Sequence, residues 1–539
     1  MGDQEQGSAA GNTSQVWING GTFLYCIMLV VREEVKQLFL LAGPLILSQV
    51  MIYSLNFISS AFSGHLGKYE LGAVSLATSV VSVTSVAMGT GLSMACDTLI
   101  SQTYGSKNLQ QIGVILQRGI LILLIFCCPC WALFINTEKI LLATKQRPEM
   151  ARLCQLYVKI FIPAVPGITM PQVFTGLVAN VLSALMNYIF LIVLKLGVAG
   201  SAWANVISQY SQNIILFMYI RWRKLHLQTW GGWTMESLQE WGPFLRLAIP
   251  SMFMFCIELW AYEMGSFLAG LISQVELGAQ SIIFQVLTVL YMTHVGIGMA
   301  AGVRVGMALG GGDPQQAKIS AMTAIVCAGC VALFLMTLLL GLKDLIAKVF
   351  TSDWQIVDLV SRTIPIVAPV HLSDAIGSGV ASGIVRGAGK QKIGAVANLI
   401  VFYIVGIPVG ISLMFTAKLG ILGLWTGLAV GSFLLSSVLL TLIFRMNWTT
   451  AAEEAQERTG LRKETGPSAV GLSFDLAEDG SSALSQGQED PHQLEHTTLI
   501  ASTLAAGILS PAQLVVRRGL AVVAGLVVLA VGITVHFTV

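Results

Sequence analysis

Long apolar stretches recur along the chain and are separated by short polar segments. About twelve of these stretches lie between Gln37 and Phe444, and one more runs from Gly519 to Val539. Each has roughly 20 residues, which is enough to cross the hydrocarbon core of a bilayer as a helix. Continuous apolar runs specify helices, because only helices and closed barrels satisfy their backbone hydrogen bonds in lipid. The pattern therefore predicts an all-α polytopic membrane protein.

The composition agrees with this class and excludes several others. Of 539 residues, 55% are hydrophobic and 11% are charged, whereas a soluble chain has about 25% charged residues. The net charge is +2 and no basic block of the nucleic-acid-binding kind is present. The nine cysteines have no metal-type spacing with histidine, so we expect packed free thiols, no metal and no cofactor. Without a nucleophile or metal motif, we do not expect an enzyme.

The two halves of the chain repeat each other. A shift of 206 residues places Ala42–Pro44 on Ala248–Pro250, and it places Glu70–Ala73 on the identical sequence at Glu276–Ala279. Two copies of a six-span unit explain this shift, and both copies then run the same way through the membrane. The repeat predicts two six-helix lobes related by pseudo-twofold symmetry, with the ligand site between or within them.

The repeat is interrupted in the first half. Val178–Asn180 matches Val396–Asn398 at an offset of 218, so the first half lacks about twelve residues. The second half carries the tract His371–Lys390 at this point. We expect the fourth helix, roughly Arg152 to Met170, to be truncated or kinked, since it also contains prolines.

Charge and polarity along the chain predict its topology. Basic residues in short loops, Arg221, Arg223, Lys224 and Arg386 among them, favour a cytoplasmic N-terminus and leave the C-terminus extracellular. Residues 449–518 are polar and poor in aromatics, so we expect disorder there. The predicted divisions are a cytoplasmic N-terminus (1–36), an N-lobe (37–221), a cytoplasmic linker (222–243), a C-lobe (244–448), a disordered cytoplasmic segment (449–518) and a final transmembrane helix (519–539).

Acidic residues at membrane depth mark the candidate site. Glu258 and Glu263 interrupt the apolar stretch Leu245–Ile272, and Asp374 lies in another such stretch. A carboxylate there costs about 2.5–3.5 kcal/mol on insertion scales and usually has a function. These acids predict a site for a proton or a cation. Glu258 shares its helix face with Tyr262, one turn on, and an acid beside an aromatic ring suits an organic cation.

The remaining candidates have common structural roles as well. Trp260 and Tyr291 either line a cavity or simply pack in the core. Gln49 and Gln285 are uncharged polar residues in spans, where bonding between helices is the usual role. We keep these four as candidate proton-binding or substrate-binding residues. Asp97 is interpreted as a helix-end polar contact, and His294 as a buried histidine with its hydrogen bonds satisfied.

Several of these segments resemble a known family. They are FSGHLGKYELGAVSLA and GLSMACDTLISQTYGSKN in the first half, and CIELWAYEMGSFLAGLISQVELGAQSI and VRVGMALGGGD in the second. They resemble the multidrug and toxin extrusion (MATE) transporters, and the tail is similar to that of the mammalian kidney-type members. The resemblance implies twelve helices in two lobes and an extra C-terminal helix. The family's acids match Glu258 and Glu263, Asp374 stands in for a longer acid, and Gln285 stands where the family has an acid.

The resemblance also implies a function. It implies a secondary active efflux transporter that exchanges protons for organic cations by alternating access, acting as a monomer in an apical plasma membrane. The proton is then the coupling ion. Two alternatives stay open. The missing tract fits a non-transporting or weakly active variant with a regulatory role. A flippase for lipid-linked sugars shares the lobed layout, but it needs a basic cavity where this chain has acids.

Overall fold

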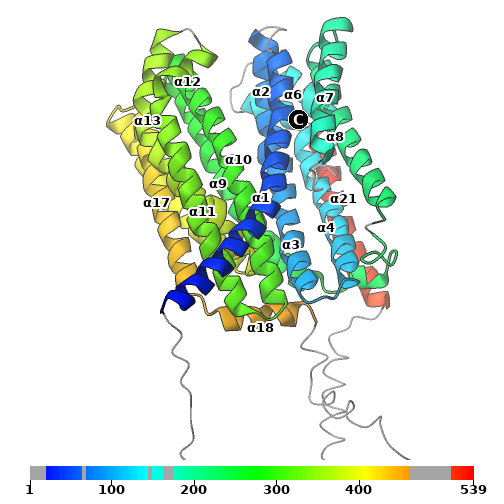
Figure 1. Ribbon diagram of the computed structural model, residues 1–539. Helices are drawn as coiled ribbons and strands as arrows, with labels where there is room; N and C mark the ends of the chain where they lie inside the picture. The colour runs from blue at the N-terminus through cyan, green and yellow to red at the C-terminus, as the bar shows by residue number, and fades with distance from the viewer. Residues whose placement is uncertain are drawn as a thin grey trace, which may run out of the picture.

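The computed structural model describes residues 20–63, 68–143, 148–161, 174–224, 226–351, 353–460 and 511–538. Every regular element in these ranges is a helix, and most of the helices run side by side in one bundle (Figure 1). The prediction of an all-α fold is confirmed.

The first half of the chain forms one series of helices. The bounds are α1 (Gly20–Ser63), α2 (Lys68–Val81), η1 (Ser82–Val86), α3 (Ala87–Gly105), α4 (Gln111–Ile135), α5 (Thr137–Ala143), α6 (Pro148–Phe161), α7 (Phe174–Asn187), η3 (Tyr188–Val193) and α8 (Gly197–Trp222).

The second half forms a similar series after the short helix η4 (Met235–Leu238). The bounds are α9 (Trp241–Ile272), α10 (Gln274–Gly310), α11 (Pro314–Gly341), α12 (Lys343–Phe350), α13 (Trp354–Asp374), η5 (Ala375–Ala381), α14 (Ser382–Gly387), α15 (Gln391–Asn398), η6 (Leu399–Gly406), α16 (Ile407–Ile411), η7 (Ser412–Thr416), α17 (Ile421–Arg445), α18 (Trp448–Arg458) and α21 (Pro511–Thr538).

The element order reflects the repeat. The long helices α1 and α9 open the two series, and each carries an internal proline, Pro44 and Pro250. A short helix follows the third long helix of each series, as α5 and as α12. Helix α13 continues through η5 and α14 to Gly387, and its counterpart α6 is described as far as Phe161.

Most of the predicted spans lie in the described part of the chain. Among the described residues, ten helices are long and apolar enough to cross a membrane, and Val178–Val193 is a shorter apolar helix. The predicted count of about thirteen also covers residues outside the described ranges, so it stays a prediction. The residues that follow α6, 162–173, lie outside the described ranges.

The predicted disordered segment begins with a helix. The Asn447 side chain caps α18 by accepting hydrogen bonds from the backbone N–H groups of Thr449 and Thr450. The prediction of disorder is therefore wrong for the first residues of 449–518 and also for the last, because α21 begins at Pro511. Residues 461–510 lie outside the described ranges. Helix α18 lies across one end of the bundle, which we call the α18 end (Figure 1).

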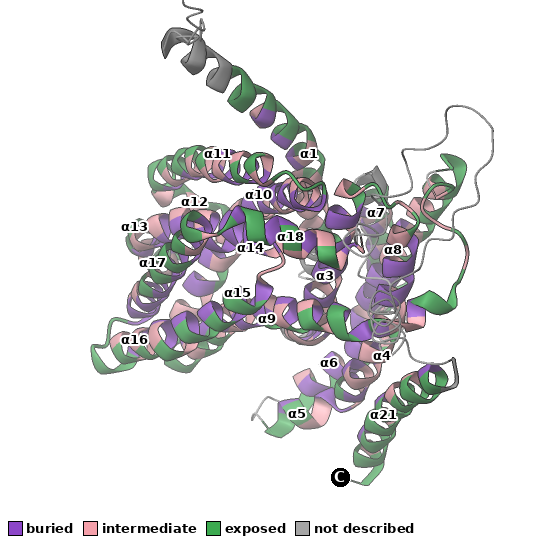
Figure 2. Ribbon diagram, turned by 90° about the horizontal axis from the view of Figure 1, so that it is seen from below, coloured by how far each residue is buried: buried purple, intermediate pink, exposed green. Residues whose placement is uncertain are grey.

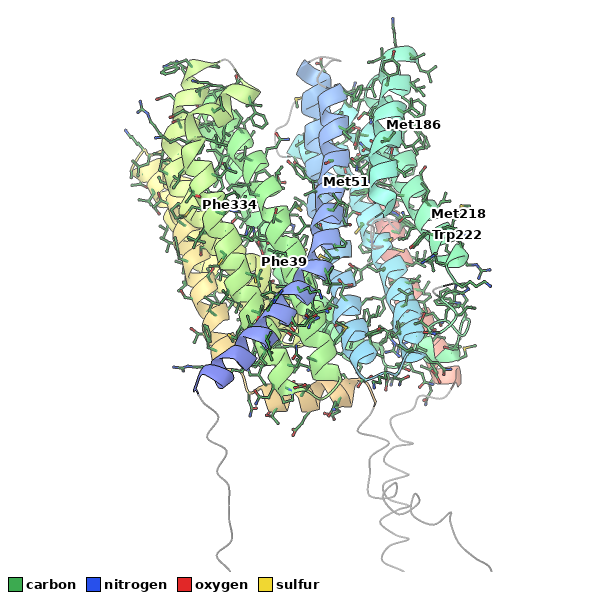
Figure 3. The ribbon with its side chains drawn as sticks, viewed as in Figure 1. Phe39, Met51, Met186, Met218, Trp222 and Phe334 are labelled. Atoms are coloured by element: carbon green, nitrogen blue, oxygen red, sulfur yellow. The ribbon has the colours of Figure 1, made fainter. Side chains whose placement is uncertain are left out.

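Apolar side chains cover the outside of the bundle, as expected for a protein in lipid (Figure 3). Phe39, Met218, Trp222 and Phe334 are each at least 42% exposed. Seen from the α18 end, the buried residues lie on the inner faces of the helices, and α21 stands at the edge with most of its surface exposed (Figure 2). Helix α21 packs on α4, where Asn136 Nδ2 donates to the Gly532 carbonyl at 2.8 Å.

A buried ion pair fastens the start of α1 to the second half. Glu34 is 4% exposed and accepts two hydrogen bonds from the Arg304 guanidinium, both at 2.5 Å. Gln316 and Ser320 of α11 donate to the same carboxylate, each at 2.6 Å. Four charge-assisted hydrogen bonds therefore join α1 to both α10 and α11.

Glycine contacts close the junction between the halves at the α18 end. A Cβ added to Gly310 would lie 1.9 Å from the Gln102 carbonyl oxygen, and one added to Gly105 would lie 2.0 Å from that of Met307. Helices α3 and α10 thus touch backbone to backbone. The hydrogen bonds from Gln102 Nε2 to the Gly387 carbonyl, 2.9 Å, and from Arg458 Nη1 to Gln102 Oε1, 3.2 Å, add α14 and α18 to this junction.

We expect Gly310→Ala to destabilise the protein by roughly 1–3 kcal/mol, because the methyl group forces α3 and α10 apart. Gly329→Ala in α11 is the matched control. A Cβ at Gly329 meets nothing within 4 Å, so alanine there should raise stability slightly through its helix propensity. Thermal unfolding in detergent measures both variants. Equal melting temperatures for the two variants would contradict the close packing of α3 on α10.

Candidate functional site

Two of the predicted acids meet in the second half. The Glu258 carboxylate on α9 accepts a hydrogen bond from the Tyr291 hydroxyl of α10 at 2.8 Å. The Asp374 carboxylate, at the end of α13, accepts hydrogen bonds from the hydroxyls of Tyr262 and Ser432. We call these five residues the acid cluster. Four helices of one half contribute to it, namely α9, α10, α13 and α17.

Small residues bring these helices together. Asp374 is followed by the π-helical segment η5, which contains Gly377 and Gly379. A Cβ on Gly377 would lie 2.2 Å from Ser436 Oγ, and one on Gly379 would lie 2.9 Å from His294 Cβ. Larger residues would push α17 and α10 away from Asp374. The run of small residues that follows Asp374 therefore sets how closely its neighbours approach.

Neither carboxylate of the acid cluster forms an ion pair with a described basic residue. Glu258 and Asp374 repel each other electrostatically. Among the ion pairs formed by the described residues, none places a basic nitrogen within 4.0 Å of either carboxylate. Hydroxyl donors stabilise the carboxylates without neutralising them. Two uncompensated acids at this depth favour binding of a positively charged guest.

An aromatic layer surrounds the Tyr262 ring. Its centroid lies 6.2 Å from that of Phe284 and 6.3 Å from those of Phe402 and Trp425. The predicted pairing of Glu258 with Tyr262 on one helix face holds in α9, but the Tyr262 hydroxyl binds Asp374 rather than Glu258. The Tyr262 ring thus packs among aromatic side chains, and its hydroxyl is part of the acid cluster.

The other predicted residues lie at the junction between the halves instead. Each of them contacts a residue of the opposite half, so they join the halves and do not complete the acid cluster. The contacts are Glu263 with the Ser79 hydroxyl, Gln285 with Tyr53, Gln49 Nε2 with Met299 Sδ at 3.2 Å, and Trp260 Nε1 with the Val83 carbonyl at 3.0 Å.

Sequence reasoning missed Ser432 and misplaced Arg386. Ser432 is one of several serines in an apolar helix, and no pattern in the chain distinguishes it. Arg386 was assigned to a loop, but it lies within the continuous helical run that ends at Gly387.

The hydrogen-bonding capacity of His294 is only partly satisfied, because Nδ1 lies 3.3 Å from the Leu290 carbonyl while no described group bonds Nε2.

We expect Tyr291→Phe to lower the KM for a cation by about tenfold and to slow turnover. The lost hydrogen bond to a charged group is worth about 1.5–3 kcal/mol, and its loss destabilises the empty, ionised site more than the occupied one. Tyr403→Phe, also in the second half, is the control, since no described contact joins Tyr403 to either acid. Concentration-dependent uptake separates KM from turnover. A raised KM in Tyr291→Phe would contradict this role for the hydroxyl.

Comparison with known proteins gives the family. The sequence model of the MatE family matches the chain twice, over residues 44–213 and 250–411. The chain belongs to the MatE family. The two matches start at Pro44 and Pro250, the same 206-residue spacing as the sequence repeat. A MatE protein with these helices is a multi-pass membrane transporter.

Curated relatives cover most of the chain. Multidrug and toxin extrusion protein 2 of Mus musculus is 49% identical over 94% of this chain and 92% of its own length. Multidrug and toxin extrusion protein 1 of Rattus norvegicus is 53% identical over 80% of this chain and 79% of its own. These relatives support the general assignment of an efflux transporter.

Solved structures share the fold. The crystal structure of the eukaryotic MATE transporter AtDTX14 superposes with a TM-score of 0.77 at 29% identity, covering 80% of this chain and all of the other. Among the described residues, no group of three or more histidine, cysteine or acidic side chains is arranged to hold a metal ion.

Proposed function

We propose that this MatE protein exchanges a proton for an organic cation at the acid cluster. The observation that carries the proposal is the pair of carboxylates, Glu258 and Asp374, held in the second half by hydroxyl donors and without an ion pair among the described residues. A proton and an organic cation each neutralise this charge. The two guests therefore compete, and competition for one charge is what couples their opposite movements.

The surroundings of the cluster favour an organic guest. The Tyr262, Phe284, Phe402 and Trp425 rings make this region apolar beside the acids. A small inorganic ion loses its hydration there without enough oxygen ligands to replace it. An organic cation is less strongly hydrated and gains from apolar and aromatic contact. We infer that drugs, toxins and metabolites with an ammonium group are the substrate class.

The junction between the halves supports alternating access. The halves are joined at the α18 end by the α3–α10 glycine contacts and by hydrogen bonds from Gln102 and Arg458. We propose that the α18 end faces the cytoplasm and that the protein works as a monomer in an apical plasma membrane. Efflux then requires this junction to open when cargo enters from the cytoplasm and to close before cargo leaves.

Reconstituted transport tests the proposal. Purified protein in liposomes that are acidic inside and alkaline outside should accumulate labelled tetraethylammonium, a cation that cannot itself exchange a proton. Accumulation should stop when a protonophore collapses the gradient. Accumulation that ignores the pH gradient, or that follows a sodium gradient instead, would refute proton exchange.

One observation favours a second candidate. The first half of the chain lacks about twelve residues of the repeat close to Pro166, which fits a weakly active or regulatory variant. A chain with about twelve residues restored after Pro166 should be compared in the same liposomes. Transport by the restored chain alone would favour the variant, whereas transport by both chains would favour the transporter.

A further inference from the structure

A positive charge lies between the acid cluster and the first half. Arg386 is on α14, and its Nη1 donates to Ser382 Oγ, one turn earlier, at 3.0 Å. Its carbonyl accepts hydrogen bonds from Thr98 Oγ1 of α3, 3.1 Å, and from Gln391 Nε2, 3.3 Å. The residue is thus fixed at the junction of the two halves, with backbone contact to α3.

Glycines hold α14 in this place. A Cβ on Gly387 would lie 2.3 Å from the Gly302 carbonyl oxygen, and one on Gly383 would lie 2.1 Å from that of Gly298. Helices α14 and α10 therefore meet at backbone distance for more than one turn. Such contact leaves α14 little freedom to rotate, so the Arg386 side chain starts from a defined position.

The guanidinium interacts with acids from both halves. On its own half it attracts Glu258, and on the first half it attracts Asp97. No acid of the described chain lies within 4.0 Å of it, so Arg386 is shared between Glu258 and Asp97 and paired with neither.

Asp97 differs from its neighbours in exposure. Cys96 and Thr98 on either side are buried, whereas the Asp97 side chain is exposed. The interpretation of Asp97 as a helix-end contact is wrong, because α3 continues for two more turns to Gly105. Helix capping therefore does not explain why Asp97 lies exposed opposite Arg386.

We propose that Asp97 is a positioning residue that draws Arg386 away from Glu258. The inference rests on the proposed function. With Asp97 ionised, it and Arg386 neutralise each other, and Glu258 keeps a negative charge that only a proton or a cargo cation can neutralise. Closing both ends around an uncompensated charge is costly at membrane depth. The protein without a guest is therefore hindered from changing between its two open states. Coupling then follows from the net negative charge of the set Glu258, Arg386 and Asp97.

Removing either charge changes this count in a predictable direction. In Asp97→Asn, Arg386 neutralises Glu258 and acts as a tethered substitute for cargo. The empty protein should then return freely, and the KM for cargo should rise. In Arg386→Gln, both Glu258 and Asp97 lack a neutralising charge, so one proton or one cation no longer neutralises the pair. The double variant restores a single negative charge, and with it the coupling. Asp374 is unchanged in all of these variants.

Two efflux measurements in liposomes loaded with labelled tetraethylammonium test the inference. In exchange against unlabelled cation, the protein carries a cation in both directions. In efflux into cation-free medium at alkaline pH, the protein must return without a guest. We expect the ratio of the second rate to the first to rise on the order of tenfold in Asp97→Asn, with a raised KM. The ratio should fall back to the wild-type value in the double variant with Arg386→Gln. Arg445→Gln, an exposed arginine of α17, is the control.

The outcomes separate the two proposals. A wild-type protein that shows no proton-dependent cation exchange would refute the proposed function and this inference together. A coupled wild-type protein with an unchanged ratio in Asp97→Asn would overturn this inference alone. A double variant with the same raised ratio as Asp97→Asn would also overturn it. If the Asn variant does not fold, Asp97→Ser makes the same charge change and decides the question.

Discussion

Glu258→Gln should abolish proton-driven cation accumulation. The amide keeps the shape of the side chain and can still accept the Tyr291 hydrogen bond, but it binds no proton and carries no charge. Without that charge, a proton and a cation no longer compete at α9. We expect the initial rate of uptake into acid-loaded liposomes to fall to background, and any residual uptake to be independent of pH.

The control for this result is another acid of the same protein. Glu453 lies exposed on α18, a helix that contributes no residue to the acid cluster, and Glu453→Gln should transport as the wild type does. Asp374→Asn should resemble Glu258→Gln, because both acids form the cluster, whereas Asp374→Glu should retain some activity. Normal pH-driven uptake by Glu258→Gln would remove this carboxylate from the mechanism.

Glu34→Ala should cause the largest loss of stability, about 3 kcal/mol. It leaves the Arg304 guanidinium without its partner at a site where Glu34 is only 4% exposed and Arg304 18% exposed. It also removes the acceptor for Gln316 and Ser320. Because α1 then loses its contact with α11, a thermal melt in detergent should show a clear decrease in the melting temperature.

The neighbouring residue provides the control for this variant. Glu33 is exposed, forms an ion pair with Lys36 at 3.8 Å and accepts a hydrogen bond from Gln37 at 3.0 Å. Both contacts lie at the surface within one turn of α1, so Glu33→Ala should leave the melting temperature unchanged. Replacing both partners, in Glu34→Leu with Arg304→Met, should recover much of the stability, because no charge is then left unpaired. A melting temperature in Glu34→Ala equal to that in Glu33→Ala would contradict a structural role for the ion pair.

The sequence predicts the fold well where hydrophobicity decides it. Long apolar runs specify α9, α10, α11 and α17, and the repeat around Pro44 and Pro250 predicts two related series of helices. Helix α18 was missed, because its composition is polar and the face that it buries consists of Trp448 and small alanines.

The site could be predicted only in part. Glu258 and Asp374 stand out because a charge at membrane depth is rare, and the structure brings both into one cluster. Helix periodicity does not tell which acid faces which half, so it did not predict that Glu263 contacts Ser79 of the first half. Ser432 and Arg386 depend on tertiary packing of α17 and α14, which leaves no local pattern.

The most direct test of proton and cation competition is a count of protons at the binding step. Detergent-solubilised protein in weakly buffered solution is titrated with tetraethylammonium while a pH indicator and bound label are followed together. The account predicts that the wild-type protein releases protons as the cation binds at a pH where the cluster is protonated, and that Glu258→Gln with Asp374→Asn releases none. Cation binding to the wild-type protein without proton release, at every pH where binding occurs, would contradict it.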